Sequence, residues 1–279
     1  MNPLLENLNV EQKTAVETTE GAVLVLSGAG TGKTKVLTTR IAHILNLGLA
    51  QPWQVLALTF TNKAANEMKN RLNDMAGGAW YAGDVWCGTF HSICLRILRN
   101  NSDRAGLRRD FLVFGDDEQK TILKTVILNL TLDIKEYPPA DWVDKISSIK
   151  DKGIGFEIDG MKKKIYDAYN AELARMNGVD FGVIILKVLQ LFESAPDILD
   201  RYQRQFKYIL VDEFQETNNA QHQFLHACVK CNGNICCVSV DDQSIYSWLC
   251  AEIKHILNFD KNYPHTPIIR LDTNYRNTD

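Results

Sequence analysis

The chain has 279 residues, of which 45% are hydrophobic, and it carries 31 lysines and arginines against 34 aspartates and glutamates, a formal charge of −3. This length holds one large domain or two ordinary ones, with enough apolar side chains to bury a core, so the composition excludes a globally disordered chain. It also excludes a strongly basic domain, the simplest sign of a nucleic-acid binder, so any contact with a polyanion must be local.

The sequence carries no sign of export or membrane insertion. The first residues, MNPLLENLNVEQ, lack the apolar run of a secretory signal, and the longest apolar stretch, GVIILKVLQLF, is interrupted by Lys187. We therefore expect a soluble, cytoplasmic protein that makes no membrane contact. Its seven cysteines are an odd number and too sparse for a disulfide scaffold, so we expect reduced thiols and no disulfide-linked partner.

Apolar runs and helical patterns alternate along the first third of the chain and again near its end. The apolar runs cover residues 22–28, 55–60, 84–90, 206–214, 234–242 and 266–274. Strands that alternate with amphipathic helices predict a parallel sheet of βαβ units. From about residue 116 to 205 the strand pattern is missing and apolar residues recur at helical spacing. The sequence therefore predicts an α/β sheet domain interrupted by an all-α insertion.

A glycine-rich segment, SGAGTGKT, follows the first apolar run and opens a helical pattern, which is the context of a phosphate-binding P-loop. Its backbone N–H groups and the helix start favour an anion, Lys33 would reach the β and γ phosphates, and the Thr34 hydroxyl would bind Mg²⁺. The residues expected at the phosphates are Gly28, Ala29, Gly30, Thr31, Gly32, Lys33, Thr34 and Lys35. Ser27 stands where the usual P-loop pattern has its first glycine. The alternative is therefore a glycine-rich turn that binds no ligand.

Two carboxylates follow a second apolar run in the segment YILVDEFQ. Asp212 and Glu213 would lie at the carboxyl end of a buried strand, where α/β sheets place their ligands. Asp212 would then hold Mg²⁺, and Glu213 would orient and polarise the attacking water. The alternative is a surface acid pair at a strand end. The P-loop upstream favours the catalytic interpretation.

Taken together, seven stretches resemble the N-terminal half of superfamily 1A DNA helicases of the UvrD, Rep and PcrA type. They are LNVEQKTAV, SGAGTGKT, LTFTNKAANEM, GTFHS, LVDEFQETN, VDDQSIYSW and LDTNYRNT. The resemblance implies a RecA-like P-loop NTPase fold, a parallel sheet with helices on both faces. It implies a discontinuous ATP-binding domain 1A at residues 1–92 and 206–272, a helical subdomain 1B at 93–205, and the start of a second RecA-like domain, 2A, at 273–279.

The resemblance also implies roles at the nucleotide, with ATP and Mg²⁺ as cofactors. Gln12 would read the adenine edge, with Arg71 and Tyr275 packing against the base. Gln243 would sense the γ-phosphate, and Arg276 would act as an arginine finger, since a guanidinium matches the charge of the transferring phosphoryl group. The catalytic set is then Lys33, Asp212, Glu213, Gln243 and Arg276, with Thr34 and Asp212 as the Mg²⁺ ligands.

For DNA, the resemblance implies a narrow track that binds single-stranded and partly duplex DNA. Its residues would be Phe60, Thr61, Asn62, His91, Tyr246 and Trp248. Aromatic faces offer sequence-tolerant stacking, and short polar groups can contact phosphates. Phe60 and Trp248 are alternatively core aromatics, and His91 is alternatively a helix cap.

One motif departs from the family pattern. Relatives usually read VGDDDQSIY followed by an Arg-Gly-Ala run, whereas this chain reads VSVDDQSIYSWLCA. Ser239 and Val240 therefore replace Gly-Asp, and Leu249 and Cys250 replace Arg-Gly, which puts the coupling of ATP to DNA in question.

A zinc site is a rival interpretation of another part of the chain. It is suggested by the cluster of His222, His226, Cys228, Cys231, Cys236 and Cys237. The adjacent pair Cys236 and Cys237 argues against it, since neighbours in a strand face opposite ways.

The favoured function is the N-terminal motor fragment of an ATP-dependent 3′ to 5′ DNA helicase or translocase, an ATP hydrolase expected to show little activity on its own. The resemblance implies a bacterial, nucleoid-associated protein of DNA repair or replication, whose partner proteins the sequence does not identify. The alternatives are a nucleotide-regulated DNA-binding module without ATP–DNA coupling and a small-molecule P-loop kinase. The kinase leaves FTNKAA and QSIYSW unexplained.

Overall fold

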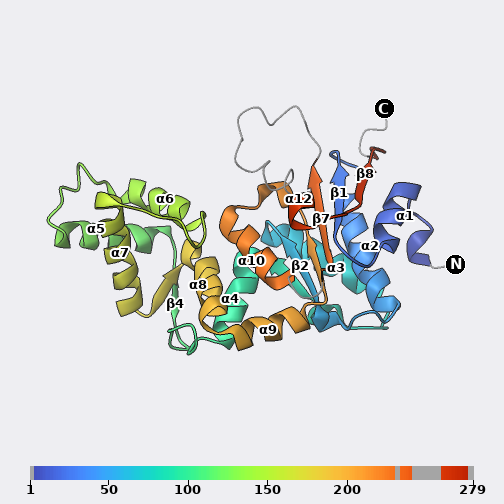
Figure 1. The fold of residues 1–279 in the computed structure, drawn as a ribbon, viewed down its shortest axis with the longest axis horizontal. Helices are drawn as coiled ribbons and strands as arrows, with labels where there is room; N and C mark the ends of the chain where they lie inside the picture. The colour runs from blue at the N-terminus through green and yellow to red at the C-terminus, as the bar shows by residue number, and fades with distance from the viewer. Residues whose placement is uncertain (1–2, 230–232, 241–258, 276–279) are drawn as a thin grey trace. The chain divides into compact units, whose positions relative to one another are not determined.

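The structure, a computed structural model, describes residues 3–229, 233–240 and 259–275 (Figure 1). The chain forms two compact units. The sheet unit comprises residues 1–93, 199–217 and 225–279, and the insertion unit comprises 94–198 and 218–224.

The sheet unit is built on a six-stranded sheet of order β3-β2-β6-β7-β1-β8, in which every neighbouring pair is parallel. Its strands are β1 (Val23–Ser27), β2 (Val55–Thr59), β3 (Trp86–Thr89), β6 (Tyr208–Val211), β7 (Ile235–Val240) and β8 (Ile268–Leu271). Successive side chains of a strand point to opposite faces, and both Val25 and its neighbour Leu24 are buried. Both faces of the sheet are therefore covered, and the α/β class with a parallel sheet is confirmed.

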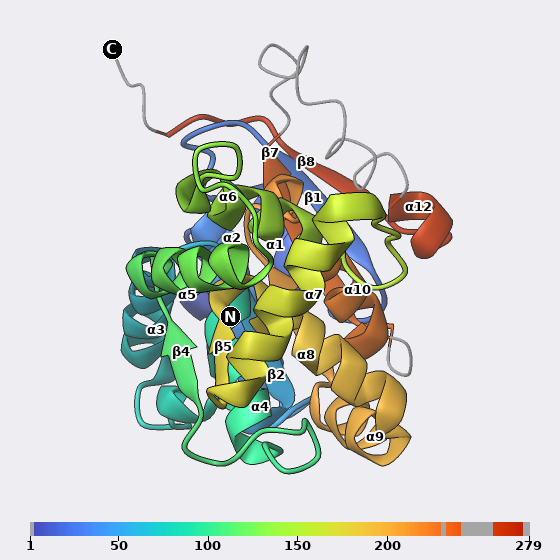
Figure 2. The same cartoon turned by 90° about the vertical axis from the view of Figure 1, so that its left-hand side faces the viewer.

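Helices connect the strands and cover the sheet (Figures 1 and 2). They are α1 (Val10–Glu17), α2 (Lys33–Asn46), α3 (Asn62–Ala76) and α12 (Phe259–Asn262), with α4 (Phe90–Asn100), α9 (Pro196–Gln205) and α10 (Asn219–Val229) divided between the units. Single 3-10 turns are η1 (Pro3–Leu5), η2 (Pro52–Gln54), η3 (Ala82–Asp84) and η4 (Phe214–Glu216). Among the described residues, no helix combines the length and the apolar content needed to cross a membrane.

Parallel pairing brings the carboxyl ends of the strands to one edge of the sheet. Ser27 at the end of β1 is in register with both Val240 of β7 and Leu271 of β8. At the other side, Thr59 of β2 is in register with Thr89 of β3. Segments that follow these strands therefore meet at this edge, which we call the carboxyl edge.

The insertion unit contains α5 (Asp116–Asn129), α6 (Pro139–Lys150), α7 (Gly160–Arg175) and α8 (Phe181–Ser194). Contrary to the all-α expectation, it also contains a parallel pair of strands, β4 (Leu112–Phe114) and β5 (Gly178–Asp180). Each strand has only three residues, which is too short for an alternating apolar pattern to show in the sequence. Gly178 suits the pairing because a Cβ there would overlap the Phe114 ring.

A buried ion pair joins the elements of the insertion unit. Lys150 Nζ of α6 lies 2.6 Å from Asp180 Oδ2, and the two side chains are 0% and 2% exposed. The Tyr169 hydroxyl donates to the same oxygen at 2.9 Å, and Asp180 Oδ1 accepts the Val183 N–H at 2.8 Å as the N-cap of α8. Burial lowers the Lys150 pKa, and the Asp180 carboxylate opposes that shift.

Candidate nucleotide-binding site

The glycine-rich loop joins β1 to α2 at the carboxyl edge. Gly30 and Gly32 adopt positive φ angles of 79° and 89°, a backbone conformation that residues other than glycine rarely adopt. Gly32 is the N-cap of α2, and Lys33 is the first residue of that helix. The loop thus places backbone N–H groups and the positive end of the helix dipole where a phosphate would bind.

The Gln12 side chain holds the loop by a hydrogen bond. Asn9 and Gln12 form a capping box at the start of α1, and the Gln12 Nε2 group donates to the Thr31 carbonyl oxygen at 2.8 Å. The Gln12 residue is 1% exposed, and a Cβ built on Gly32 would lie 2.8 Å from its Nε2. The structure therefore brings Gln12 to the phosphate loop, while its contact with adenine stays a prediction.

Tyr275 also reaches this loop from the far end of the described chain. Its N–H donates to the Gly30 carbonyl oxygen at 3.0 Å, and its hydroxyl accepts the Asn9 Nδ2 group at 3.0 Å. Tyr275 is 54% exposed, and its packing against a base stays a prediction. Asn9 was not among the predicted site residues, although the Asn-x-x-Gln pattern of a capping box was visible in the sequence.

Arg71 lies within α3, and its packing against the base stays a prediction. It is the tenth residue of α3, a helix that begins at the carboxyl edge and runs away from it, so it lies about 13 Å along the axis from the helix start. Its guanidinium pairs with Glu67 one turn earlier, at 2.6 Å. Lys35 of α2 donates from its Nζ to the Asn7 carbonyl oxygen, ahead of α1, at 2.6 Å.

The predicted carboxylates follow β6 at the same edge. Asp212 is 6% exposed, and the Lys33 ammonium forms an ion pair with Glu213 Oε1 at 2.8 Å. Burial, with the neighbouring Glu213 charge as a second cause, raises the Asp212 pKa to about 6, and the Lys33 charge partly offsets that rise. Glu213 has a left-handed backbone with φ 49°. Strained backbone of this kind is concentrated at functional sites.

Both carboxylates and the loop lysine are therefore close together, as the sequence predicted. The Thr34 hydroxyl and the Asp212 carboxylate are oxygen ligands of the kind that Mg²⁺ prefers, usually one or two carboxylates beside phosphates and water. A cavity of 330 Å³ adjoins the loop, and its lining residues are Leu26, Ser27, Gly28, Ala29, Thr31, Leu271, Asp272 and Asn274. The glycine-rich loop, Lys33, Thr34 and Asp212 are the kinds of groups that a nucleotide triphosphate with Mg²⁺ would need, and its binding stays a prediction.

The predicted DNA residues that the structure describes follow β2 and β3 at the carboxyl edge. Phe60 is half-buried and packs edge-on against Phe90, with ring centroids 6.2 Å apart, whereas Thr61 and Asn62 are exposed. His91 is half-buried, and burial lowers its pKa.

His91 was alternatively predicted as a helix cap, and α4 has a different residue in that role. The Ser92 N–H donates to the Thr89 hydroxyl at 3.2 Å, just before the first turn of the helix. Asn62 is the first residue of α3, whose N-cap is Thr61, with the Ala64 N–H donating to its hydroxyl at 3.1 Å. Whether any of these residues contacts DNA stays a prediction.

Some predicted residues lie outside the described part of the chain. They are Gln243, Tyr246, Trp248 and Arg276 from the site, Leu249 and Cys250 from the divergent motif, and Cys231 from the zinc alternative. Within residues 3–229, 233–240 and 259–275, no group of three histidine, cysteine or acidic side chains is arranged to bind a metal. Cys236 packs in the same hydrophobic cluster as Val25 and Val238, and Cys237 is buried on the opposite face of the sheet.

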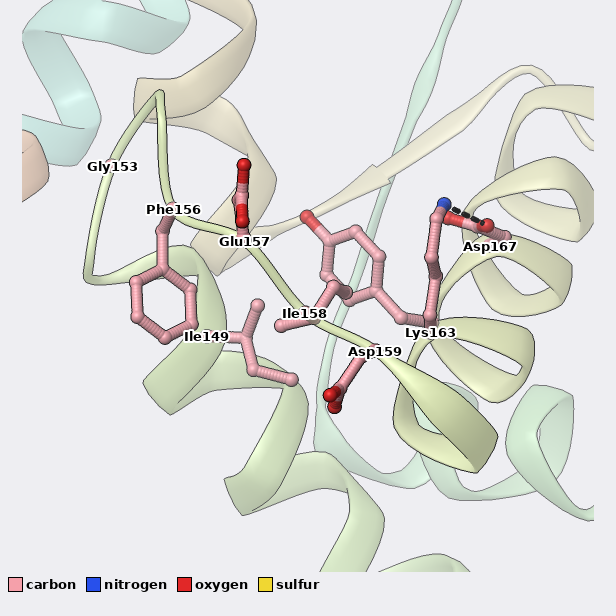
Figure 3. A pocket seen from close by; sticks show the side chains of 9 residues that line it. Ile149, Gly153, Phe156, Glu157, Ile158, Asp159, Lys163 and Asp167 are labelled. Carbon is pink, nitrogen blue, oxygen red and sulfur yellow. Dashed lines mark hydrogen bonds and ion pairs between the residues drawn. The ribbon is translucent and has the colours of Figure 1, made fainter.

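A larger pocket of 720 Å³ lies in the insertion unit, between α6, the following loop and α7 (Figure 3). Three of its lining residues are the acids Glu157, Asp159 and Asp167, and its lysine, Lys163, pairs with Asp167 at 2.6 Å. This charge repels phosphates, so the pocket does not fit a nucleotide.

The sheet topology, the loop before α2 and the acid pair after β6 define a RecA-like P-loop domain. Residues 8–264 match the family described as "UvrD/REP helicase N-terminal domain", and the chain belongs to this family. It is 42% identical to the ATP-dependent DNA helicase PcrA of Staphylococcus aureus (strain Mu50) and 41% identical to that of Staphylococcus epidermidis (strain ATCC 12228). Each alignment is 288 residues long and covers the whole of this chain. The chain spans 39% of the length of these relatives.

Proposed function

We propose that this chain is the ATP-binding and single-strand-binding part of an ATP-dependent DNA helicase or translocase. The proposal depends on one observation. The phosphate loop and two carboxylates lie together at one edge of the sheet, and the Lys33 ammonium is 2.8 Å from Glu213 Oε1. The family and its PcrA relatives, which are named ATP-dependent DNA helicases, supply the DNA side of the proposal.

The residues divide into a binding group and a reacting group. The loop N–H groups and Lys33 bind the phosphates, and Thr34 with Asp212 would hold Mg²⁺, which supplies charge neutralisation at the phosphates when bound. The Tyr275 ring would pack against the base. Gln12 holds the loop through its hydrogen bond to the Thr31 carbonyl oxygen. The positions of Gln12 and Tyr275 support their assignment, since each is hydrogen-bonded to a carbonyl oxygen of the loop.

Glu213 is the proposed general base. A γ-phosphate would compete with Glu213 for the Lys33 ammonium, because both are anions within reach of one cation. Once the ammonium turns to phosphate, the carboxylate is free to accept a proton from the attacking water. Replacing Glu213 by Gln removes the basic site at nearly constant shape, so ATP should still bind while hydrolysis falls by about a hundredfold or more.

On the DNA side, Phe60 offers part of an aromatic face at the carboxyl edge, and the neighbouring Thr61 and Asn62 offer exposed polar groups. Stacking of this kind is tolerant of sequence and needs no basic domain, which is consistent with the chain's charge of −3. We further propose 3′ to 5′ movement and a role in DNA repair or replication, by analogy with the family alone. We also keep as proposals the domain limits 1–92 with 206–272 for domain 1A, 93–205 for subdomain 1B and 273–279 for the start of domain 2A.

The test is ATP turnover by the purified chain with and without single-stranded DNA. We expect a low rate that DNA increases and that Lys33→Ala abolishes, with Lys124→Ala, an exposed lysine of the insertion unit, as the matched control. A rate that depends on Lys33 but ignores DNA would instead favour the DNA-binding module without coupling or the small-molecule kinase. A rate that survives Lys33→Ala would refute the proposed site.

A further inference from the structure

A glutamine side chain connects the proposed general base to the end of a neighbouring strand. Gln215 lies in η4, two residues after Glu213, and its Nε2 group donates to Glu213 Oε2 at 2.6 Å. Its Oε1 atom accepts the Ser239 hydroxyl at 3.0 Å and the Val240 N–H at 3.1 Å, both at the end of β7. Because two donors hold the oxygen, the amide is oriented with its nitrogen toward the carboxylate.

The arrangement holds Glu213 from both sides. One carboxylate oxygen accepts a hydrogen bond from the Lys33 ammonium, and the other accepts one from the Gln215 side-chain amide. If the γ-phosphate draws Lys33 away, the Gln215 contact is the side-chain hydrogen bond that stays in place. A general base must keep its position within hydrogen-bond reach of the water it activates, so this second contact matters most during the reaction itself.

Ser239 is the member of this connection that departs from the family pattern. Relatives usually carry glycine here, in VGDDDQ, and glycine has no hydroxyl to offer. In this chain the Ser239 residue is 0% exposed, its hydroxyl donates to Gln215, and its carbonyl oxygen accepts the Ser27 hydroxyl at 3.3 Å. A buried hydroxyl without a partner would be costly, so the contact with Gln215 is firmly specified.

We propose that Ser239 is a positioning residue for ATP hydrolysis, which acts through Gln215 to hold Glu213 in place. The inference rests on the proposed function, since it assigns Glu213 the role of base. It also offers a reason why the divergent segment VSVDDQ does not by itself imply a broken site. The serine hydroxyl supplies a polar contact to Gln215, which in turn donates to Glu213, at a position where the family residue has no side chain.

The first test compares the kinetics of ATP hydrolysis in Ser239→Ala, Ser239→Thr and the unchanged chain. Ser239→Ala removes one of the two donors to Gln215, and we expect kcat to fall about fivefold with KM for ATP within about twofold. Ser239→Thr keeps a hydroxyl and should restore most of kcat. Ser194→Ala removes a hydroxyl that bonds only within α8, at 2.8 Å to the Gln190 carbonyl oxygen, and should change neither constant.

A second test reads the side-chain amide of Gln215 directly and needs no turnover. In a ¹⁵N-labelled chain, its NH₂ resonances can be identified by their loss in Gln215→Ala. We expect them to be dispersed and slow to exchange in the unchanged chain, and to move toward the free-amide position in Ser239→Ala but not in Ser239→Thr. Unchanged resonances in Ser239→Ala would overturn the proposal. If the unchanged chain fails to hydrolyse ATP, the role of Glu213 as a base fails, and the amide signal still decides whether Ser239 orients Gln215.

Discussion

The Lys33 ammonium lies 2.8 Å from the Glu213 carboxylate, although 180 residues separate them in the chain. The two residues meet because β1 and β6 are parallel strands on either side of β7, so the loops that follow them share one edge. Both side chains keep some contact with solvent, at 16% and 30% exposure. The pair therefore places a cation and a base where a ligand can reach them both.

Gly32→Ala should separate the phosphate loop from Gln12. Alanine at this positive φ carries a backbone cost of about 1 to 2 kcal/mol, and its Cβ must also displace the Gln12 amide and break the hydrogen bond to Thr31. The control is Gly48→Ala, where φ is also positive, at 69°, but nothing lies within 4 Å of the added Cβ. In urea unfolding, Gly32→Ala should lose about 1 kcal/mol more than Gly48→Ala. Equal losses would mean that Gln12 does not hold the loop.

Asp212→Asn should stabilise the chain at neutral pH. The folded-state pKa of about 6 exceeds the ordinary 3.8, so between these values the folded chain retains a proton that the unfolded chain releases. The free energy of unfolding therefore falls as pH rises through this window, and the full cost is present above it. Because asparagine carries no charge, the variant should be more stable by up to about 3 kcal/mol at pH 7.5 and nearly unchanged at pH 3.5. Thermal unfolding at both pH values checks this, and an equal difference at the two values would contradict it.

Asp180→Ala should strongly destabilise the insertion unit. It leaves the fully buried Lys150 ammonium without its carboxylate, at a cost of about 3 to 5 kcal/mol. Adding Lys150→Met to the same chain removes the stranded charge and should recover a large part of the loss. The exposed pair of Arg104 and Asp197, at 50% and 66% exposure, gives the control, since Asp197→Ala should cost less than about 1 kcal/mol. If the double variant is no more stable than Asp180→Ala, the charge is not the cause.

Phe60→Ala should weaken binding of single-stranded DNA. Loss of one stacking face is worth about 1 to 3 kcal/mol per base, or roughly tenfold or more in affinity. Phe60→Leu keeps an apolar contact with Phe90 but lacks a flat ring, so it should lose a similar amount while preserving stability. Phe156→Ala removes a 45% exposed phenylalanine of the insertion unit and serves as the control in a fluorescence anisotropy titration. Affinity that ignores both Phe60 variants would favour the core-aromatic interpretation.

The sequence predicted those features that depend on local pattern or on strand order. The parallel sheet, the loop before α2 and the acids after β6 each follow from an apolar run and the residues that end it. It could not predict contacts made by side chains distant in sequence, such as Gln12 with the Thr31 carbonyl or Ser239 with Gln215, because neither has a periodic signal. The role of Arg71 rests on the resemblance alone, since the structure pairs its guanidinium with Glu67 of the same helix and its packing against the base stays a prediction.

The most direct test of the site is equilibrium binding of a fluorescent ATP analogue with Mg²⁺ to the purified chain. We expect saturable binding that Lys33→Ala weakens by at least about tenfold, since a hydrogen bond to a charged group is worth about 1.5 to 3 kcal/mol. Lys124→Ala should bind as the unchanged chain does. Binding that is the same in Lys33→Ala and in the unchanged chain would contradict the assignment of this loop as the phosphate site.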